Sequence, residues 1–258
     1  MTTALAWQHA RISPLGWVLV ALRVMLMLAL LLACVPLHYL WRLLGLKRLW
    51  PRVFLAGVGS VAGLDIRRHG KRHPGALLLS NHVSWLDILA LSHTANSAFV
   101  AHDGLAVGPL KWLCELNDTV FIARHRRSSV NEQAGQIREA LAGGSTLTLF
   151  PEGTTSDGTD LLPFKSSLLG AVEPLPDGAV VQPVLLAYAD APHMAWVGEE
   201  PGAANFKRIL ARVKPVRLDV HFLPPLAGEE LANRKTMTAA AQAALERANS
   251  QAKINAKA

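Results

Sequence analysis

The chain is organised around the octet Ser80-Asn81-His82-Val83-Ser84-Trp85-Leu86-Asp87. An apolar run at residues 76–79 leads into it and predicts a buried strand. Ser84 then stands as an N-cap before the apolar positions of a helix, which we expect to run to about His93. His82 would thus follow the carboxyl end of a strand, where open α/β sheets usually bind ligands. A histidine there can act as a general base if a carboxylate such as Asp87 orients it.

The same residues also have a purely structural interpretation. Ser84-x-x-Asp87 fits a capping box, and an acidic residue in the first turn is favoured by the helix dipole. His82 would then be an ordinary turn histidine. The octet alone leaves both interpretations open, since a short motif is only a hypothesis until its context is known.

The bulk composition narrows the class of protein. The chain has 258 residues, of which 51% are hydrophobic, which suits one α/β domain with a full core and a smaller appendage. Only 17% are charged, yet the net charge is +7, so an anionic membrane surface or an anionic substrate is favoured. Nucleic acid is the competing partner, but with 6% aromatic residues and an apolar N-terminal region we expect none. Without a C-x-x-C pair or an H-E-x-x-H motif, we expect no disulfide framework and no metal site.

The N-terminal region is apolar from about residue 15 to residue 40. We favour a membrane-embedded helix, spanning or re-entrant, because its length approaches the ~20 residues that cross a bilayer. Arg23 interrupts the run, and we expect it to snorkel to the interface. A signal peptide and a buried helix of a soluble core remain as alternatives.

Residues 41–50 interleave apolar and basic side chains, with a tryptophan at each end, and predict an interfacial amphipathic segment. Positive charge after the apolar run places the remainder of the chain on the cytoplasmic side, so we expect the inner (cytoplasmic) membrane with the active site on its cytoplasmic face. The expected organisation is a membrane-associated helical region over 1–56, an α/β domain over 57–250 and a flexible tail over 251–258.

From about residue 64 the pattern alternates between strands and helices, which predicts a mainly parallel central sheet with flanking helices. The expected strands are 64–68, 76–79, 97–101, 120–123, 146–150, 180–186 and 216–222. The expected helices are 84–93, 105–116, 129–142 and 228–248.

Three strand ends carry polar side chains. The first offers His82 and Asp87, the second Arg124, and the third a loop of small and polar residues over 151–158 that contains Glu152. Parallel strands would bring these loops to one edge of the sheet. Each group has a plain alternative, since Arg124 lies in a basic run that could be solvated and Glu152 could simply pair with an arginine.

Four segments together resemble the glycerolipid acyltransferases, which acylate lysophosphatidic acid and related lysolipids. Residues 81–87 match that family's H-x-x-x-x-D block and 121–124 resemble its second block. Residues 150–154 match the third block and 181–184 resemble the fourth. The resemblance implies a lysolipid O-acyltransferase that needs no cofactor and takes its acyl group from a thioester of acyl carrier protein or coenzyme A.

The family's site residues carry over to this chain by position. His82 and Asp87 would be catalytic, and a second group would bind substrate: Phe121, Arg124, Glu152, Gly153 and Thr154. The expected acceptor is 1-acyl-sn-glycerol-3-phosphate. Thr155 departs from the arginine that phosphate-acceptor members commonly carry, and the run Thr-Thr-Ser-Asp-Gly resembles the branch that acylates lyso-ornithine lipid, which is the alternative acceptor.

The expected mechanism is direct transfer. His82 takes the proton from the acceptor hydroxyl, and Asp87 holds the imidazole tautomer. Backbone N–H groups near Gly153 would stabilise the oxyanion. Lys165 would bind headgroup or donor phosphates, unless it is only a surface lysine. The alternative from another class is a non-catalytic lipid-binding protein of the membrane surface, which would have no use for His82 and Asp87 at this spacing.

Overall fold

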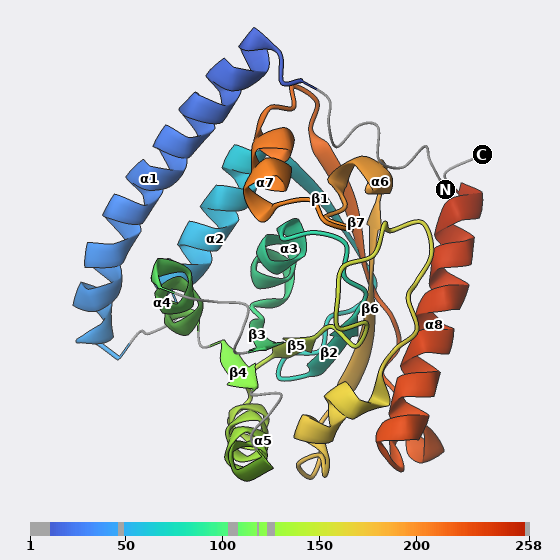
Figure 1. Ribbon diagram of the computed structural model, residues 1–258. Helices are drawn as coiled ribbons and strands as arrows, with labels where there is room; N and C mark the ends of the chain where they lie inside the picture. The colour runs from blue at the N-terminus through green and yellow to red at the C-terminus, as the bar shows by residue number, and fades with distance from the viewer. Residues whose placement is uncertain (1–10, 46–48, 103–107, 118, 123–126, 256–258) are drawn as a thin grey trace.

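The computed structural model describes residues 11–45, 49–102, 108–117, 119–122 and 127–255. Its centre is a seven-stranded sheet with the order β1-β7-β6-β2-β5-β3-β4 (Figure 1). All neighbouring strands are parallel except β6 and β7, which are antiparallel. This confirms the expected mainly parallel sheet. The strands are β1 (Leu64–His69), β2 (Leu77–Ser80), β3 (Ala98–His102), β4 (Val120–Ile122), β5 (Leu147–Leu149), β6 (Val181–Tyr188) and β7 (Val216–Phe222).

Helices cover both faces of the sheet. Helices α2, α3 and α7 pack on one face with α1 outside them, and α8 lies along the other face (Figure 1). The α-helices are α1 (Pro14–Arg42), α2 (Leu49–Ala62), α3 (Leu86–Ala95), α4 (Pro109–Leu116), α5 (Arg127–Ala142), α6 (Ala191–Met194), α7 (Gly202–Leu210) and α8 (Arg234–Asn255); the 3-10 turns are η3 (Ser166–Val172) and η4 (Gly228–Leu231).

Strand β2 lies at the centre of the sheet, between β6 and β5. Its residues Leu77, Leu78 and Leu79 have no exposed surface, because helices cover them from both sides. A strand buried on both faces shows a continuous apolar run rather than an alternation. This is why the run before Asn81 could be recognised as a strand, and the chain leaves it directly into the octet.

Helix α1 has 29 residues and is about 43 Å long. Val20 and Met27 pack into the core, whereas its other face exposes large apolar side chains such as Leu22, Met25 and Leu32. Within the described part of the chain it is the one helix long and apolar enough to cross a membrane. A long apolar face in contact with solvent indicates association with a membrane.

The guanidinium of Arg23 on α1 is hydrogen-bonded within the protein, and its snorkelling to the membrane interface stays a prediction. Its Nη1 atom donates hydrogen bonds to the backbone oxygens of Leu210 and Arg212, both at 2.8 Å. These carbonyls lie at the end of α7, where the last groups of a helix lack partners and carry partial negative charge. Arg23 therefore fastens α1 to the α/β domain, helped by Lys207, whose ammonium lies 5.9 Å from the Trp17 ring.

Two boundaries of the expected organisation fall inside helices of the structure. The boundary at residue 56 falls inside α2, whose Val58 and Ala62 pack into the same core as the sheet. Part of the predicted tail, 251–255, continues α8, held by an ion pair of 2.7 Å between Lys253 and Asp160.

The described residues of the expected amphipathic segment lie at the corner where α1 ends and α2 begins. Its residues 46–48 lie outside the described residues. On either side of them, the Trp41 and Trp50 rings meet edge to face with centroids 5.6 Å apart. The two tryptophans that suggested an interfacial segment therefore pack against each other at this corner.

Candidate active site

The side chains of His82 and Asp87 meet just beyond the end of β2. His82 Nδ1 lies 2.7 Å from Asp87 Oδ2. Asp87 is fully buried, whereas the His82 side chain keeps 21% of its surface exposed. The Asp87 side chain is thus held inside the protein, and the His82 side chain is partly accessible from outside.

The carboxylate of Asp87 accepts several hydrogen bonds. Oδ2 accepts from the backbone N–H groups of Val83 at 2.7 Å and Ser84 at 3.0 Å, in addition to His82. Such a set of donors suits an ionised carboxylate, which only accepts. We therefore place the proton of His82 on Nδ1, which leaves the Nε2 lone pair free to accept a proton.

The contacts of Asp87 bear on both interpretations of the Ser84-x-x-Asp87 pattern, the capping box and the catalytic pair. The helix begins at Leu86, two residues later than Ser84 predicted, and its N-cap Trp85 makes no side-chain cap bond. The Asp87 carboxylate accepts from the Ser84 N–H as an acidic capping-box residue does, while the same oxygen holds His82. The Asp87 carboxylate therefore fits both interpretations: it caps the start of the helix, and it is the partner of His82.

Tyr188 is a site residue that the motifs did not reveal. Its hydroxyl donates to Asp87 Oδ1 at 2.5 Å from the end of β6. Burial, and then the adjacent Asp87 charge, raise the pKa of this hydroxyl well above its ordinary value, so it stays protonated and donates. The predicted strand stopped at Leu186. Extending its two-residue alternation by one step would have placed Tyr188 on the same face.

Ring stacking and the contacts of the preceding residue also hold the imidazole of His82 in place. Its ring stacks on Phe150, with centroids 4.0 Å apart and planes 14° from parallel. The preceding residue, Asn81, exchanges two hydrogen bonds with the Leu186 backbone, at 3.0 and 2.8 Å. Both contacts fix the octet to neighbouring strands, so the free side of the imidazole has a defined direction.

Glu152 lies under the site rather than at its surface. The side chain has no exposed surface, and its two oxygens accept from the backbone N–H groups of His82 at 2.9 Å and Leu162 at 3.1 Å. Burial raises the pKa of this carboxyl from 4.5 to about 7, although the two hydrogen bonds oppose that shift. In this geometry Glu152 links the third loop to the octet.

The loop after β5 wraps around the same edge. Ser156 donates its N–H to the His82 carbonyl at 2.7 Å, which ties the loop to the octet. Gly153 has a φ of +68°, and a Cβ atom there would lie 3.0 Å from Leu168 and 3.3 Å from Lys165 Nζ. The Lys165 ammonium is therefore next to this turn. The Gly153 N–H donates to the Phe150 carbonyl at 3.1 Å, so that group is already engaged and does not point to an oxyanion.

The three remaining predicted site residues are Thr154, Phe121 and Arg124. Thr154 is exposed on the third loop, and the hydroxyl of its neighbour Thr155 donates to the backbone oxygen of Trp196. Phe121 belongs to β4, whose backbone pairs with β3. Arg124 lies outside the described residues.

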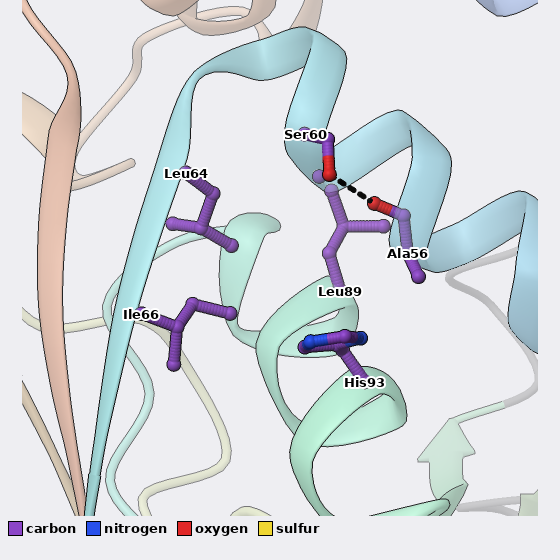
Figure 2. Close-up of a pocket in the computed structure, with 7 residues that line it drawn as sticks. Ala56, Ser60, Leu64, Ile66, Leu89 and His93 are labelled. Atoms are coloured by element: carbon purple, nitrogen blue, oxygen red, sulfur yellow. Dashed lines mark hydrogen bonds between the residues drawn. The ribbon is translucent and has the colours of Figure 1, made fainter.

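A small cavity of about 110 Å³ lies apart from these residues, between α2, β1 and α3. Figure 2 shows Leu89 and His93 of α3 facing Leu64 and Ile66 of β1 across it, with Ser60 hydrogen-bonded to the Ala56 carbonyl beside them. It shares α3 with Asp87, but its lining contains none of the predicted site residues.

Comparisons with known proteins identify the family of this chain. The acyltransferase family model matches residues 63–187, which include the octet and end one residue before Tyr188. The chain is 35% identical over 243 residues to the lyso-ornithine lipid O-acyltransferase of Brucella abortus (strain 2308), covering 86% of this chain and 91% of that protein. It therefore belongs to the acyltransferase family, and it is an enzyme.

Three further proteins are similar to this chain. Lyso-ornithine lipid O-acyltransferase from Rhizobium meliloti (strain 1021) is 36% identical, covering 87% of this chain and 83% of its own. The 1-acyl-sn-glycerol-3-phosphate acyltransferase of Neisseria gonorrhoeae is 38% identical over 54% of this chain and 56% of its own. The crystal structure of the 1-acyl-sn-glycerophosphate (LPA) acyltransferase PlsC from Thermotoga maritima has a TM-score of 0.58 at 21% identity, covering 79% and 78% of the two chains, and shows the shared fold.

Proposed function

We propose that this lysolipid acyltransferase esterifies the free hydroxyl of lyso-ornithine lipid, with an acyl thioester of acyl carrier protein or coenzyme A as donor. The His82–Asp87 pair, with Nε2 free and Nδ1 held at 2.7 Å, is the observation that carries the chemistry. Lysophosphatidate is the acceptor that the motifs put first. We place lyso-ornithine lipid first instead, because the matches to lyso-ornithine lipid acyltransferases reach 86–87% of this chain whereas the match to the Neisseria gonorrhoeae enzyme reaches 54%.

Thr155 supports this choice of acceptor. A phosphate monoester carries up to two negative charges and is well held by a bidentate arginine. Lyso-ornithine lipid presents one carboxylate and one ammonium, so it needs fewer cations. Thr155 supplies no charge, and its hydroxyl is engaged by Trp196. Lys165, whose Nζ atom lies beside the Gly153 turn, is a cation available for the headgroup carboxylate or for donor phosphates.

The proposed reaction is one proton transfer coupled to one acyl transfer. Nε2 of His82 takes the proton of the acceptor hydroxyl while that oxygen forms a bond to the thioester carbonyl carbon. The carbon–sulfur bond then breaks, and the leaving thiolate takes the proton back from His82. Asp87 stabilises the imidazolium between these steps. A thioester is already activated, so no covalent acyl-enzyme is needed.

We also propose that Glu152 acts by positioning. Its oxygens are engaged by the His82 and Leu162 backbones, so it fixes the octet against the third loop. Gly153 supplies the left-handed turn that lets this loop pass Lys165. We leave direct contact with the substrates to Thr154, which is exposed, and to Phe121 and Arg124, which carry over by position from the family's second block.

The membrane supplies the acceptor. Helix α1 is fastened to α7 through Arg23, so we propose that its exposed apolar face lies in the lipid while the sheet stays outside it. The chain's net charge of +7 favours an anionic membrane surface. Because acyl carrier protein and coenzyme A thioesters are cytosolic, we assign the site to the cytoplasmic face of the inner membrane.

An acceptor panel tests the proposal. Purified protein would receive one acyl thioester with either lyso-ornithine lipid or 1-acyl-sn-glycerol-3-phosphate, and the products would be identified by mass. We expect ornithine lipid to form with a kcat/KM at least about tenfold higher, which corresponds to about 1.4 kcal/mol. Faster formation of phosphatidate would assign the enzyme to the other acceptor. Thiol release without any lipid product would indicate a thioesterase.

His82→Ala separates this enzyme from a non-catalytic lipid-binding protein. General-base catalysis contributes about 10²–10⁴-fold, so kcat should fall by at least about a hundredfold. His193→Ala, which removes a histidine that pairs with Asp190 at 2.6 Å on the surface, is the matched control and should leave turnover unchanged. Near-normal turnover of His82→Ala would exclude the mechanism.

A further inference from the structure

A second cluster of histidine and carboxylate side chains lies away from the active site, at the β1–β7 edge of the sheet. His69 ends β1, and Asp219 and His221 lie two residues apart on β7. His69 and His221 are direct register partners across this parallel pair. Residues of widely separated segments are thus brought together by strand pairing, which no sequence motif could reveal.

The three side chains point to one place. His69 Nε2 lies 2.6 Å from Asp219 Oδ1. The two imidazole rings stack with centroids 4.4 Å apart and planes 14° from parallel. One ligand atom from each of the three residues can be chosen so that all lie within 4.8 Å of one another. A single ion would require these side chains to rotate so that the three atoms come closer together, and all three side chains are partly exposed.

The cluster is separate from the catalytic residues. Asp219 and His221 pair with Ala187 and Leu185 of β6, which pack on the α8 side of the sheet. Tyr188, which holds Asp87, belongs to the cluster that packs on the opposite side with α3. On the α8 side of the sheet, β1 and β7 therefore carry a group of polar side chains that the proposed acyl-transfer reaction does not use.

We propose that His69, Asp219 and His221 form a binding site for a divalent transition-metal ion of the zinc class. Two imidazoles and one carboxylate are the donors that zinc accepts, at about 2.0–2.2 Å, with water in the remaining position. Magnesium prefers an all-oxygen octahedron and should bind here poorly. The ion would join the ends of β1 and β7 and so strengthen the edge of the sheet.

The chemistry of the donors suits a metal. Neutral imidazoles give their lone pairs to a metal ion, and metal binding displaces any proton that they carry. Asp219 supplies a negative charge that the ion neutralises. Two arginines of the same face, Arg67 and Arg217, lie in register with Asp219 and Asp65; their positive charge opposes that of the ion, and the two carboxylates offset it.

Isothermal titration with zinc chloride tests the site. The full-length protein would be purified in detergent and freed of any polyhistidine tag. We expect one zinc per chain, with affinity at least about tenfold weaker in His69→Ala, in His221→Ala and in Asp219→Asn. His193→Ala is the control, because His193 forms a histidine–aspartate pair of the same 2.6 Å length with Asp190 and is not part of the three-residue group that the described residues offer to a metal.

A thermal readout makes the test independent of activity. Zinc should raise Tm of the wild type and of His193→Ala, because a ligand that binds only the folded state stabilises it, and should not raise Tm of His69→Ala. Absence of stoichiometric zinc binding would overturn the proposal. So would equal affinity of the wild type and the three cluster variants, an equal loss in His193→Ala, or competition by magnesium at the same concentration.

Discussion

The hydroxyl of Tyr188 donates a 2.5 Å hydrogen bond to Asp87 Oδ1, while His82 holds Oδ2 of the same carboxylate at 2.7 Å. Both oxygens of the buried acid therefore have fixed partners, one on β6 and one in the octet. An orienting carboxylate sets the direction of the imidazole only if its own position is fixed. We therefore expect Tyr188 to be a positioning residue for the proposed catalytic pair, His82 and Asp87.

Tyr188→Phe should lower kcat by about 10- to 100-fold and leave KM nearly unchanged, because a hydrogen bond to a charged group is worth about 1.5–3 kcal/mol. Steady-state kinetics with saturating donor would measure this. The matched control is Tyr39→Phe, which alters the other of the chain's two tyrosines, on the exposed part of α1. A loss of stability with unchanged kcat would give Tyr188 a structural role only.

The sequence allowed the sheet to be predicted well because the strands are apolar and regularly spaced. Both ends of the last strand, 216–222, are predicted correctly. The reason is that Val216, Leu218, Val220 and Phe222 alternate with polar residues that face out. The two-residue period of a half-buried strand needs no tertiary information. Fully buried β2 was recognised by its continuous apolar run.

Partners that lie far away in the sequence could not be predicted. Arg23 looked like a membrane-interface residue because its acceptors, the Leu210 and Arg212 carbonyls, are 187 and 189 positions away. The cluster of His69 with Asp219 and His221 depends in the same way on the register of β1 and β7. Local patterns located His82 and Asp87 because those two residues are only five positions apart.

Glu152 should make stability depend on pH in a defined direction. Its carboxyl pKa is about 7 when folded and 4.5 ordinarily, so the neutral form is favoured by folding. This contribution is complete below about pH 4.5 and is lost as pH rises through 7, a change of about 3 kcal/mol. Denaturant unfolding of wild type and Glu152→Gln at several pH values would measure it.

The glutamine variant serves as the reference because it cannot ionise. The stability of the wild type relative to Glu152→Gln should decrease between about pH 5 and pH 8 and then level off. Other titrating groups are common to both proteins and cancel. A difference that stays constant over this range would mean that the Glu152 carboxyl keeps an ordinary pKa.

Arg23→Met should destabilise the fold rather than only weaken lipid binding. The variant leaves the Leu210 and Arg212 carbonyls without their charged donor, which should cost about 2 kcal/mol and lower Tm by roughly 4–8 °C. Arg42→Met is the control, because Arg42 is exposed at the last residue of α1. If Arg23→Met kept its Tm but released the protein from anionic vesicles, Arg23 would be a headgroup anchor as the sequence pattern predicts.

Thr155→Arg should shift acceptor preference toward lysophosphatidate. The arginine would place a bidentate cation beside the Glu152–Gly153 turn, near Lys165, and raise kcat/KM for 1-acyl-sn-glycerol-3-phosphate by about tenfold. Turnover of lyso-ornithine lipid should not rise, because its single carboxylate gains less and its ammonium is repelled. Thr155→Val removes the hydroxyl bond to Trp196 without adding charge and should change both acceptors by the same factor. An equal change for both acceptors in Thr155→Arg would show that this position does not select the headgroup, and selectivity would then have to come from other residues of the site.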